Sequence, residues 1–374
     1  MPKKFLPIIS LVLISAFAAN AAEPTFKETY DSVVKNYEQK KYADSLKDVD
    51  KALSLAGTDA EKLRVLSYKF KNYNIQCNYI EAANAAGDIL KLQELTGPQR
   101  DQWLLLQIIG YCNGKKFDEC IAACDQLIDS KEAEYIEQGY HYKTAAYLLM
   151  KDNDKAFEVA SKYRAEYTAG VKIPMYYRSV IYQMTALKNK KEYDKAVAVI
   201  TPEEAEEIPG ALKSEYYNLL GSTYKDLKKY QEAAAAFEKA GQGNHAYQGG
   251  LGWYYLGDVY SIMNKDNEAI AAFTKVYELN DASSTHKTMA IVRCAKLLDK
   301  NGKPEDALVM LEKVNLIVAP DAEWAARGKI LAGNILLHHD KKDDAKKQFE
   351  AIVGMKGVSA SYINQAKAEL EKLK

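Results

Sequence analysis

The histidines are the first candidates for chemistry, and two of them stand beside an acidic residue. His338, His339 and Asp340 follow one another directly. Adjacent residues on a helix point about 100° apart, whereas residues three or four positions apart share a face and can share a ligand. The group also comes at the end of a predicted helix, where polar and cationic side chains interact favourably with the C-terminus. The spacing therefore does not predict a metal site.

The cysteines do not form a metal-binding pattern either. The five are Cys77, Cys112, Cys120, Cys124 and Cys294. Cys120 and Cys124 share a helix face, but no further ligand lies near them in the sequence to complete a zinc site. We expect them to be buried thiols, which behave as small apolar side chains. An odd number leaves at least one cysteine unpaired, and whether Cys77 and Cys112 form a disulfide stays open.

No short motif of an enzyme class is present. The sequence lacks the His-Glu-x-x-His, Gly-x-Ser-x-Gly and phosphate-loop patterns. The glycine-rich stretch at 241–252 has no strand before it and no Lys-Ser/Thr pair, so it is predicted to be a turn between helices. The acidic pairs at 203–204 and 206–207 are interpreted as loop charges, because catalytic carboxylates need a cleft that shifts their pKa values. The sequence predicts no catalytic, cofactor-binding or metal-binding residue, and favours a protein that is not an enzyme.

The overall charge excludes two further classes of partner. The 374 residues include 51 basic and 51 acidic side chains. Nucleic acid would require a basic stripe, and anionic membranes would require a cationic surface. Tyrosine is abundant, with 27 residues, and its apolar ring with a polar tip suits half-buried positions and recognition surfaces.

The N-terminus resembles a secretory signal. Lys3 and Lys4 precede an uncharged apolar run from Phe5 to Ala19, and Ala19 and Ala21 supply small residues at a cleavage site. We expect residues 1–21 to be removed and the protein to be exported, to the bacterial periplasm or by secretion. An uncleaved anchor is the alternative, but the run contains Pro7 and is shorter than the roughly 20 residues of a spanning helix. No second long apolar run follows, so no membrane span is predicted after cleavage.

A repeat of 36 to 40 residues runs through the rest of the chain. Nine small residues mark it, and the residue four positions after each marker is apolar. Positions seven after the marker are apolar or aromatic in eight of the nine, which completes one face of a helix. A small residue is expected where two helices cross closely. The markers are Ser45, Ala82, Cys120, Ala156, Ala196, Ala233, Ala269, Ala307 and Ala345.

A second helical pattern precedes each marker and contains glycine in three repeats. Glycine inside a helix costs about 0.5–1 kcal/mol relative to alanine. We therefore expect Gly221, Gly257 and Gly333 to lie where the two helices of a pair approach most closely, with Ala233 and Ala269 as the residues opposite. Tyrosines at 217, 224, 230 and 260 occupy packing positions of the same pattern.

Two of these repeats resemble a known family. Residues 253–273 contain WYYLGDVY and AIAAF, and residues 217–237 contain YNLLGSTY and AAAAF. Both are similar to the tetratricopeptide repeat pattern W-x2-L-G-x2-Y…A-x3-F. The resemblance covers about residues 25–374 and is weaker before residue 200. The period is longer than the usual 34 residues.

The resemblance implies an all-α fold, a right-handed α-solenoid of about nine helical hairpins followed by a capping helix. We expect about five repeats in residues 22–205, four in residues 206–358 and the capping helix in residues 359–374. Pro304 is expected in the first turn of a second helix, and Pro202 is expected to end another second helix early. Residues 201–210 are either a hinge or a long loop in one rigid array, and continuous stacking favours the loop.

The resemblance also implies a binding groove lined by the first helix of each pair. Its side chains are polar and of both charges, which suits capture of an extended peptide. The positions carried over are Arg178, Thr185, Asn218, Ser222, Lys225, Tyr254, Asp258, Ser261, Lys296, Asp299, Arg327, Ile330 and Asn334.

We therefore expect a protein-interaction scaffold of the cell envelope that binds a peptide or a partner segment, without a cofactor. A cell-wall or carbohydrate-handling binding protein with a tyrosine-lined surface is the alternative, although most tyrosines of the repeat fall on packing positions. An enzyme with a site that leaves no motif is a further alternative. The sequence does not predict the partner or the oligomeric state.

Overall fold

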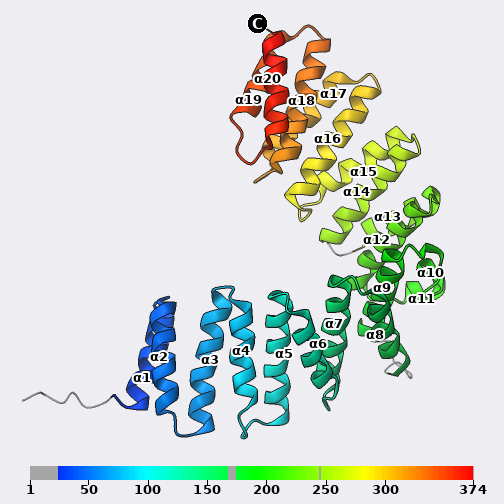
Figure 1. The fold of residues 1–374 in the computed structure, drawn as a ribbon. Coiled ribbons are helices and arrows are strands. Elements are labelled where there is room, and N and C mark those ends of the chain that lie inside the picture. The colour runs from blue at the N-terminus through cyan, green and yellow to red at the C-terminus, as the bar shows by residue number, and fades with distance from the viewer. Residues whose placement is uncertain (1–23, 167–173, 244–245, 374) are drawn as a thin grey trace, which may run out of the picture. The chain divides into compact units, whose positions relative to one another are not determined.

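The computed structural model describes residues 24–166, 174–243 and 246–373 (Figure 1). Within these ranges the chain forms twenty α-helices and one 3-10 helix, η1, and contains no strand. The predicted all-α class is confirmed. The predicted signal segment, residues 1–21, lies outside the described residues.

The chain folds as two compact units, one ending at Glu119 and the other beginning at Cys120. The boundary predicted between residues 205 and 206 falls inside the second unit. The helices of the first unit are α1 (Phe26–Glu38), α2 (Tyr42–Leu55), α3 (Asp59–Ile75), α4 (Tyr79–Leu90) and α5 (Gly97–Asn113), and α6 (Phe117–Ile128) begins in it.

The second unit continues the same alternation of helices. Each first helix of this unit is followed by a shorter second helix, and α20 ends the series. The described chain therefore contains the nine predicted hairpins and the capping helix. The helices are α7 (Ala133–Leu149), α8 (Asn153–Glu166), α9 (Pro174–Asn189), α10 (Tyr193–Val197), α11 (Pro202–Glu206), α12 (Gly210–Asp226), α13 (Tyr230–Gly241), α14 (Ala246–Ile262), α15 (Asp266–Glu278), α16 (Ser284–Lys300), α17 (Pro304–Glu312), η1 (Lys313–Leu316), α18 (Ala322–His338), α19 (Lys342–Val353) and α20 (Ala360–Lys372).

The nine marker residues occupy the centres of the helix pairs. All nine are 0% exposed, and every residue four positions later is buried as well. The small side chain at the marker lets the second helix approach the first, and the apolar residue one turn later fills the space beside it. The repeat predicted from the sequence therefore matches the spacing of the buried residues in the structure.

The helix glycines face a different residue from the one expected. A Cβ atom at Gly257 would lie 2.7 Å from the ring of Phe273, and one at Gly333 would lie 2.5 Å from the ring of Phe349. Gly221 has the same relation to Phe237, at 2.8 Å. The prediction that these glycines face Ala233 and Ala269 is therefore wrong. The residues opposite them lie one helical turn later in the second helix. The glycine is needed because an aromatic ring lies flat against the helix backbone there.

The turn inside each hairpin has the same backbone conformation in all nine. Five residues before every marker the chain adopts a left-handed conformation, with φ between 57° and 72°. The following amide closes the turn with a bond to a carbonyl of the first helix, as between Lys229 N and Tyr224 O at 2.9 Å. Only Gly302 is a glycine. The left-handed residues are Lys40, Cys77, Lys115, Lys151, Lys191, Lys228, Asn264, Gly302 and Asp340.

Glycine at one of these turns is expected to stabilise the protein. A residue with a Cβ atom is strained by about 1 kcal/mol in the left-handed conformation. Glycine avoids this strain, but it loses more conformational entropy on folding, which cancels part of the gain. Lys228→Gly should therefore raise the free energy of unfolding by about 0.5–1 kcal/mol, measured by urea denaturation. The control is Lys229→Gly, because Lys229 has φ −84° and gains nothing from glycine. Equal effects of the two changes would contradict the account.

Residues 201–210 are tied to the core by their acidic side chains. The second helix α10 ends at Val197, before Pro202, and Pro202 is the first residue of the short helix α11. Ala205 and Ile208 are buried in the same cluster as residues of α9 and α12. Three glutamates accept hydrogen bonds from tyrosine hydroxyls of the first helices: Glu204 from Tyr176, Glu206 from Tyr217, and Glu207 from Tyr177. This attachment favours a long loop in a continuous array over a hinge.

One of these contacts predicts a pH dependence of stability. Glu206 accepts from Lys239 Nζ at 2.6 Å, from Lys213 Nζ at 2.9 Å and from Tyr217 at 2.9 Å. These donors, Lys239 first, lower the pKa of Glu206 to about 2. The contribution of the Glu206 carboxylate to the free energy of unfolding is therefore fully present above pH 4.5, its ordinary pKa. It is lost as the pH falls toward 2.

Glu206→Gln is expected to lower the free energy of unfolding at pH 7 by about 1 kcal/mol at most, because the side chain is half-exposed and screened. The difference from the wild type should shrink between pH 4.5 and 2, measured by denaturant titration at each pH. Glu278→Gln serves as a control at an exposed position. A difference that stays constant with pH would mean that the carboxylate charge is not involved.

Candidate functional site

The thirteen positions predicted to line a groove all belong to the second unit, and they lie on α9, α12, α14, α16 and α18. We call the surface that these positions form, together with the charged and aromatic residues beside them on the same helices, the first-helix face. Its side chains contact one another across successive first helices. Arg178 Nη1 on α9 donates to Glu215 Oε2 on α12 at 2.6 Å, and Lys188 Nζ lies 2.9 Å from Asp226 Oδ2 on the same two helices.

Asp258 continues this series of contacts across three helices. Its Oδ2 lies 3.4 Å from Lys225 Nζ on α12, and its Oδ1 lies 3.7 Å from Arg293 Nη2 on α16. The carboxylate on α14 therefore joins a cation before it to a cation after it. Half-buried ion pairs of this kind add less to stability than to the fixed placement of their groups.

The series ends on an aromatic ring. The Arg327 guanidinium lies 4.3 Å from the centre of the Trp324 ring, and the Arg293 guanidinium lies 5.7 Å from it. Both distances are within the range of cation–π attraction. Arg327 itself is exposed on α18, so the stack presents a cation to solvent in a defined place.

Several predicted groove residues are not free surface groups. Tyr254 is 5% exposed and Ile330 is 7% exposed, and both pack in hydrophobic clusters. Asn218 is 8% exposed and donates from Nδ2 to the carbonyl oxygen of Gln248 at 2.8 Å. Thr185 and Ser261 donate their hydroxyls to carbonyls of their own helices. Of the predicted residues, Lys296 and Arg327 are the exposed ones, and Ser222, Asp299 and Asn334 are half-buried.

Sequence reasoning missed the partners of these residues. Glu215, Arg293 and Trp324 stand beside the positions that the family pattern marks. A signal was present, because Arg178 and Glu215 are one repeat apart and opposite in charge, as are Lys188 and Asp226. Opposite charges at similar positions of consecutive repeats predict contacts between neighbouring first helices.

A histidine also belongs to this region. Tyr182 OH lies 2.7 Å from His141 Nδ1, which joins α9 to α7. Burial, and to a lesser extent the Arg178 cation, lower the pKa of His141, and burial raises the pKa of Tyr182. The pair is therefore uncharged at neutral pH and serves as a contact between helices.

The cysteines and the tyrosines bear on the remaining predictions. Cys124 and Cys294 are buried free thiols and Cys77 is an exposed free thiol, whereas Cys112 and Cys120 are disulfide-bonded. The expectation of a free thiol at Cys120 is therefore wrong, and Cys77 takes no part in a disulfide. Tyrosines 217, 224, 230 and 260 pack in or against the hydrophobic clusters.

Two kinds of site are absent from the part of the chain that the structure describes. No group of three or more histidine, cysteine, aspartate or glutamate side chains there has an arrangement that holds a metal ion. Among the same residues, no helix has the length and hydrophobicity needed to span a bilayer.

The fold and the first-helix face define an all-α helical-repeat solenoid. Residues 261–373 match the model of the tetratricopeptide repeat-like domain, and residues 214–240 match a tetratricopeptide repeat. These matched residues belong to the tetratricopeptide repeat family, as their sequence pattern predicted. Such proteins are in general non-catalytic modules that bind protein or peptide partners, so the fold is that of a protein-interaction scaffold.

Three solved structures illustrate what this chain is similar to. The C-terminal part of a TPR repeat-containing protein from Cytophaga hutchinsonii is 17% identical and has a TM-score of 0.50, over 70% of this chain and 98% of that one. A tetratricopeptide repeat protein from Parabacteroides merdae is 16% identical over 82% of this chain and 97% of its own, with a TM-score of 0.38. YrrB, described as a TPR protein with an unusual peptide-binding site, is 20% identical over 51% of this chain and 91% of its own, with a TM-score of 0.36. Among curated proteins, none matches the sequence.

Proposed function

We propose that this chain is a periplasmic, non-enzymatic scaffold that holds a segment of a partner protein on the first-helix face. The observation that supports the proposal is the series of contacts from Arg178 and Glu215 to Asp258, Arg293 and Trp324. These contacts place groups of both charges in defined positions before a partner arrives. Such pre-ordering reduces the entropy lost on binding, and a mixed set of donors and acceptors suits the backbone of an extended peptide.

Export is supported by the N-terminal pattern and by the cysteines. Lys3, Lys4 and the apolar run form a signal sequence with a cleavage site after Ala21. Disulfide-bonded Cys112 and Cys120 are typical of a protein in an oxidising compartment. The balanced charge of the chain gives no reason to propose a nucleic acid as partner.

Mass spectrometry of the protein recovered from a bacterial periplasmic fraction tests the export. The expected mass is that of a chain that begins at Ala22. Alkylation of the denatured but unreduced protein should label Cys77, Cys124 and Cys294 only. A full-length chain confined to the cytoplasm, with five alkylated cysteines, would contradict this part of the proposal.

Photo-crosslinking from the first-helix face tests the binding site. A photoreactive amino acid replaces Lys296 or Asn334 in the producing cell, and the matched control carries it at Glu305, an exposed residue of the second helix α17. The same partner should be captured from both test positions and not from the control. Arg327→Ala should then weaken capture from Asn334. Equal capture from Glu305 would show that the first-helix face is not the binding site.

A further inference from the structure

The second helix of the eighth hairpin is shorter than those of the neighbouring hairpins. α17 has 9 residues, whereas α15 has 13 and α19 has 12. After α17 the chain forms the 4-residue helix η1 and then a bent segment that leads to α18, in which Ala319 has φ 51°. The missing turns leave space between α17 and α19, above α18.

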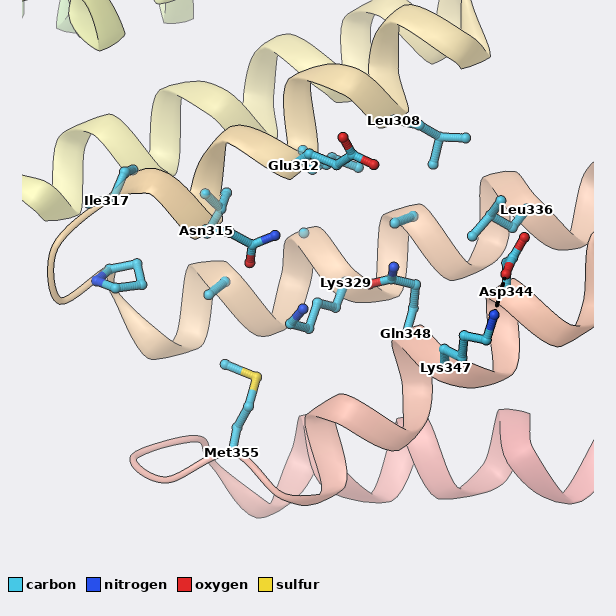
Figure 2. Close-up of a pocket in the computed structure, with 16 residues that line it drawn as sticks. Leu308, Glu312, Asn315, Ile317, Lys329, Leu336, Asp344, Lys347, Gln348 and Met355 are labelled. Atoms are coloured by element: carbon cyan, nitrogen blue, oxygen red, sulfur yellow. Dashed lines mark hydrogen bonds and ion pairs between the residues drawn. The ribbon is translucent and has the colours of Figure 1, made fainter.

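This space is a groove of about 640 Å³ (Figure 2). Its wall is mixed, with nine apolar side chains among sixteen lining residues, and its rim carries Glu312, Lys329, Asp344 and Lys347, two acidic and two basic residues. Met355, whose flexible side chain adapts to different shapes, lies along one edge. The apolar side chains of the lining are those of Leu308, Leu311, Val314, Ile317, Pro320, Ala325, Ala332, Leu336 and Met355.

The groove is distinct from the first-helix face. On α18, the groove is lined by Ala325, Lys329 and Ala332, which follow one another at intervals of four and three residues. Arg327 and Asn334, which belong to the first-helix face, each come two residues after a groove position and therefore point to the opposite side of the helix. A ligand in the groove leaves the first-helix face free.

An apolar projection stands directly beside the groove. Leu316 is 74% exposed and Val318 is 87% exposed, more than the other large apolar side chains in the described ranges. The residue between them, Ile317, lines the groove. The Ser284 hydroxyl donates to the carbonyl of Val318 at 2.9 Å, and Ile317 N donates to Val314 O at 3.2 Å. These bonds hold the projection in place, so inserting it into a cavity costs little ordering.

We propose that the projection of one copy of this chain inserts into the groove of a second copy, so that two chains associate through this surface. A cavity and an adjacent apolar projection can form the two halves of a self-complementary contact, which a two-fold axis closes at two chains. The rim supports the same occupant, because two acidic and two basic side chains let identical rims meet without net repulsion.

Sedimentation analysis of the mature protein tests the proposal. The wild type should dimerise in the micromolar range, and Leu316→Asp and Val318→Asp should each weaken the dimer roughly 10- to 100-fold, the effect of losing one buried aliphatic side chain. Leu149→Asp is the matched control, because Leu149 is 63% exposed and lies on α7. Unchanged circular dichroism of all three variants verifies that they are folded.

Crosslinking identifies the surface. In a Cys77→Ser background, one tagged chain carries Val318→Cys and a differently tagged chain carries Gln348→Cys, since Gln348 lines the groove. A mixed disulfide between the two tags is expected, and none with Leu149→Cys in place of Val318→Cys. A wild type that stays monomeric overturns the proposal and assigns the groove to another occupant. So does a dimer that the aspartate variants do not weaken. Photo-crosslinking from Lys296 in the same variants reports separately on the first-helix face.

Discussion

Phe273→Ala is expected to lower the free energy of unfolding by about 3–5 kcal/mol, the range for removing a buried aromatic ring. Phe273 is 1% exposed and lies in the largest hydrophobic cluster of the second unit. Its ring rests on the backbone at Gly257, which has no side chain to fill the vacated space. The cavity therefore cannot collapse easily. Urea denaturation followed by circular dichroism measures the change.

A double-mutant cycle shows whether the glycine is responsible. Gly257→Ala places a methyl group 2.7 Å from the Phe273 ring, and the crowding opposes the roughly 1 kcal/mol that alanine gains in a helix. In the background of Phe273→Leu the same methyl group has room. The double variant should then be more stable than the sum of the single changes predicts. Additive effects would show that the ring and the glycine are not coupled.

Arg164→Ala is expected to lower the free energy of unfolding by about 1.5–3 kcal/mol, the range for hydrogen bonds that involve a charged group. Arg164 Nη1 donates to Gln183 Oε1 at 2.5 Å, and its Nη2 donates to Tyr176 OH at 2.9 Å. Glu204, which accepts from Tyr176, lies 4.0 Å from Nη2. One guanidinium thus connects α8 to α9 and to the segment that replaces a long second helix. Without it, three polar groups lose a partner in a poorly hydrated place.

Two neighbouring changes act as controls for Arg164. Lys162→Ala lies on the same helix, where its pair with Glu166 at 3.9 Å is exposed, and should cost less than about 0.5 kcal/mol. Arg164→Lys keeps the charge but loses the forked geometry, and should recover only part of the stability. If lysine restores the wild-type value in thermal unfolding, charge alone explains the role of Arg164.

The regular part of this fold could be predicted from the sequence because it depends on short-range spacing. The markers at Ala233 and Ala269 were recognisable since each repeat needs a small residue at one helix crossing. Pro304 likewise begins α17, as its tolerance at the first helical position indicated. Gly257 was correctly placed at a close approach, but its partner was assigned one turn too early, to Ala269 instead of Phe273.

The irregular parts depend on contacts that a period does not show. The end of α17 at Glu312 has no proline or glycine to announce it, so the groove beside it could not be foreseen. Asn218 and Tyr254 were placed correctly on first helices, but their burial depends on the next hairpin, through Gln248 for Asn218 and His286 for Tyr254. Cys120 occupies a regular marker position, and its disulfide is independent of that regularity.

The left-handed turns have a consequence for how this protein can change in length. Each lies five residues before a marker, so a segment that runs from Lys228 to the residue before Asn264 begins and ends at equivalent points of the backbone. Loss or duplication of such a segment in the gene rejoins the chain in a conformation that it already has. The stability of such an array is the sum of the contributions of its repeats and of the interfaces between them. Loss or duplication of one segment therefore changes the free energy of unfolding by the contribution of one repeat and one interface. The distance between a binding face and any other surface of the protein can thus change in evolution by the length of whole hairpins.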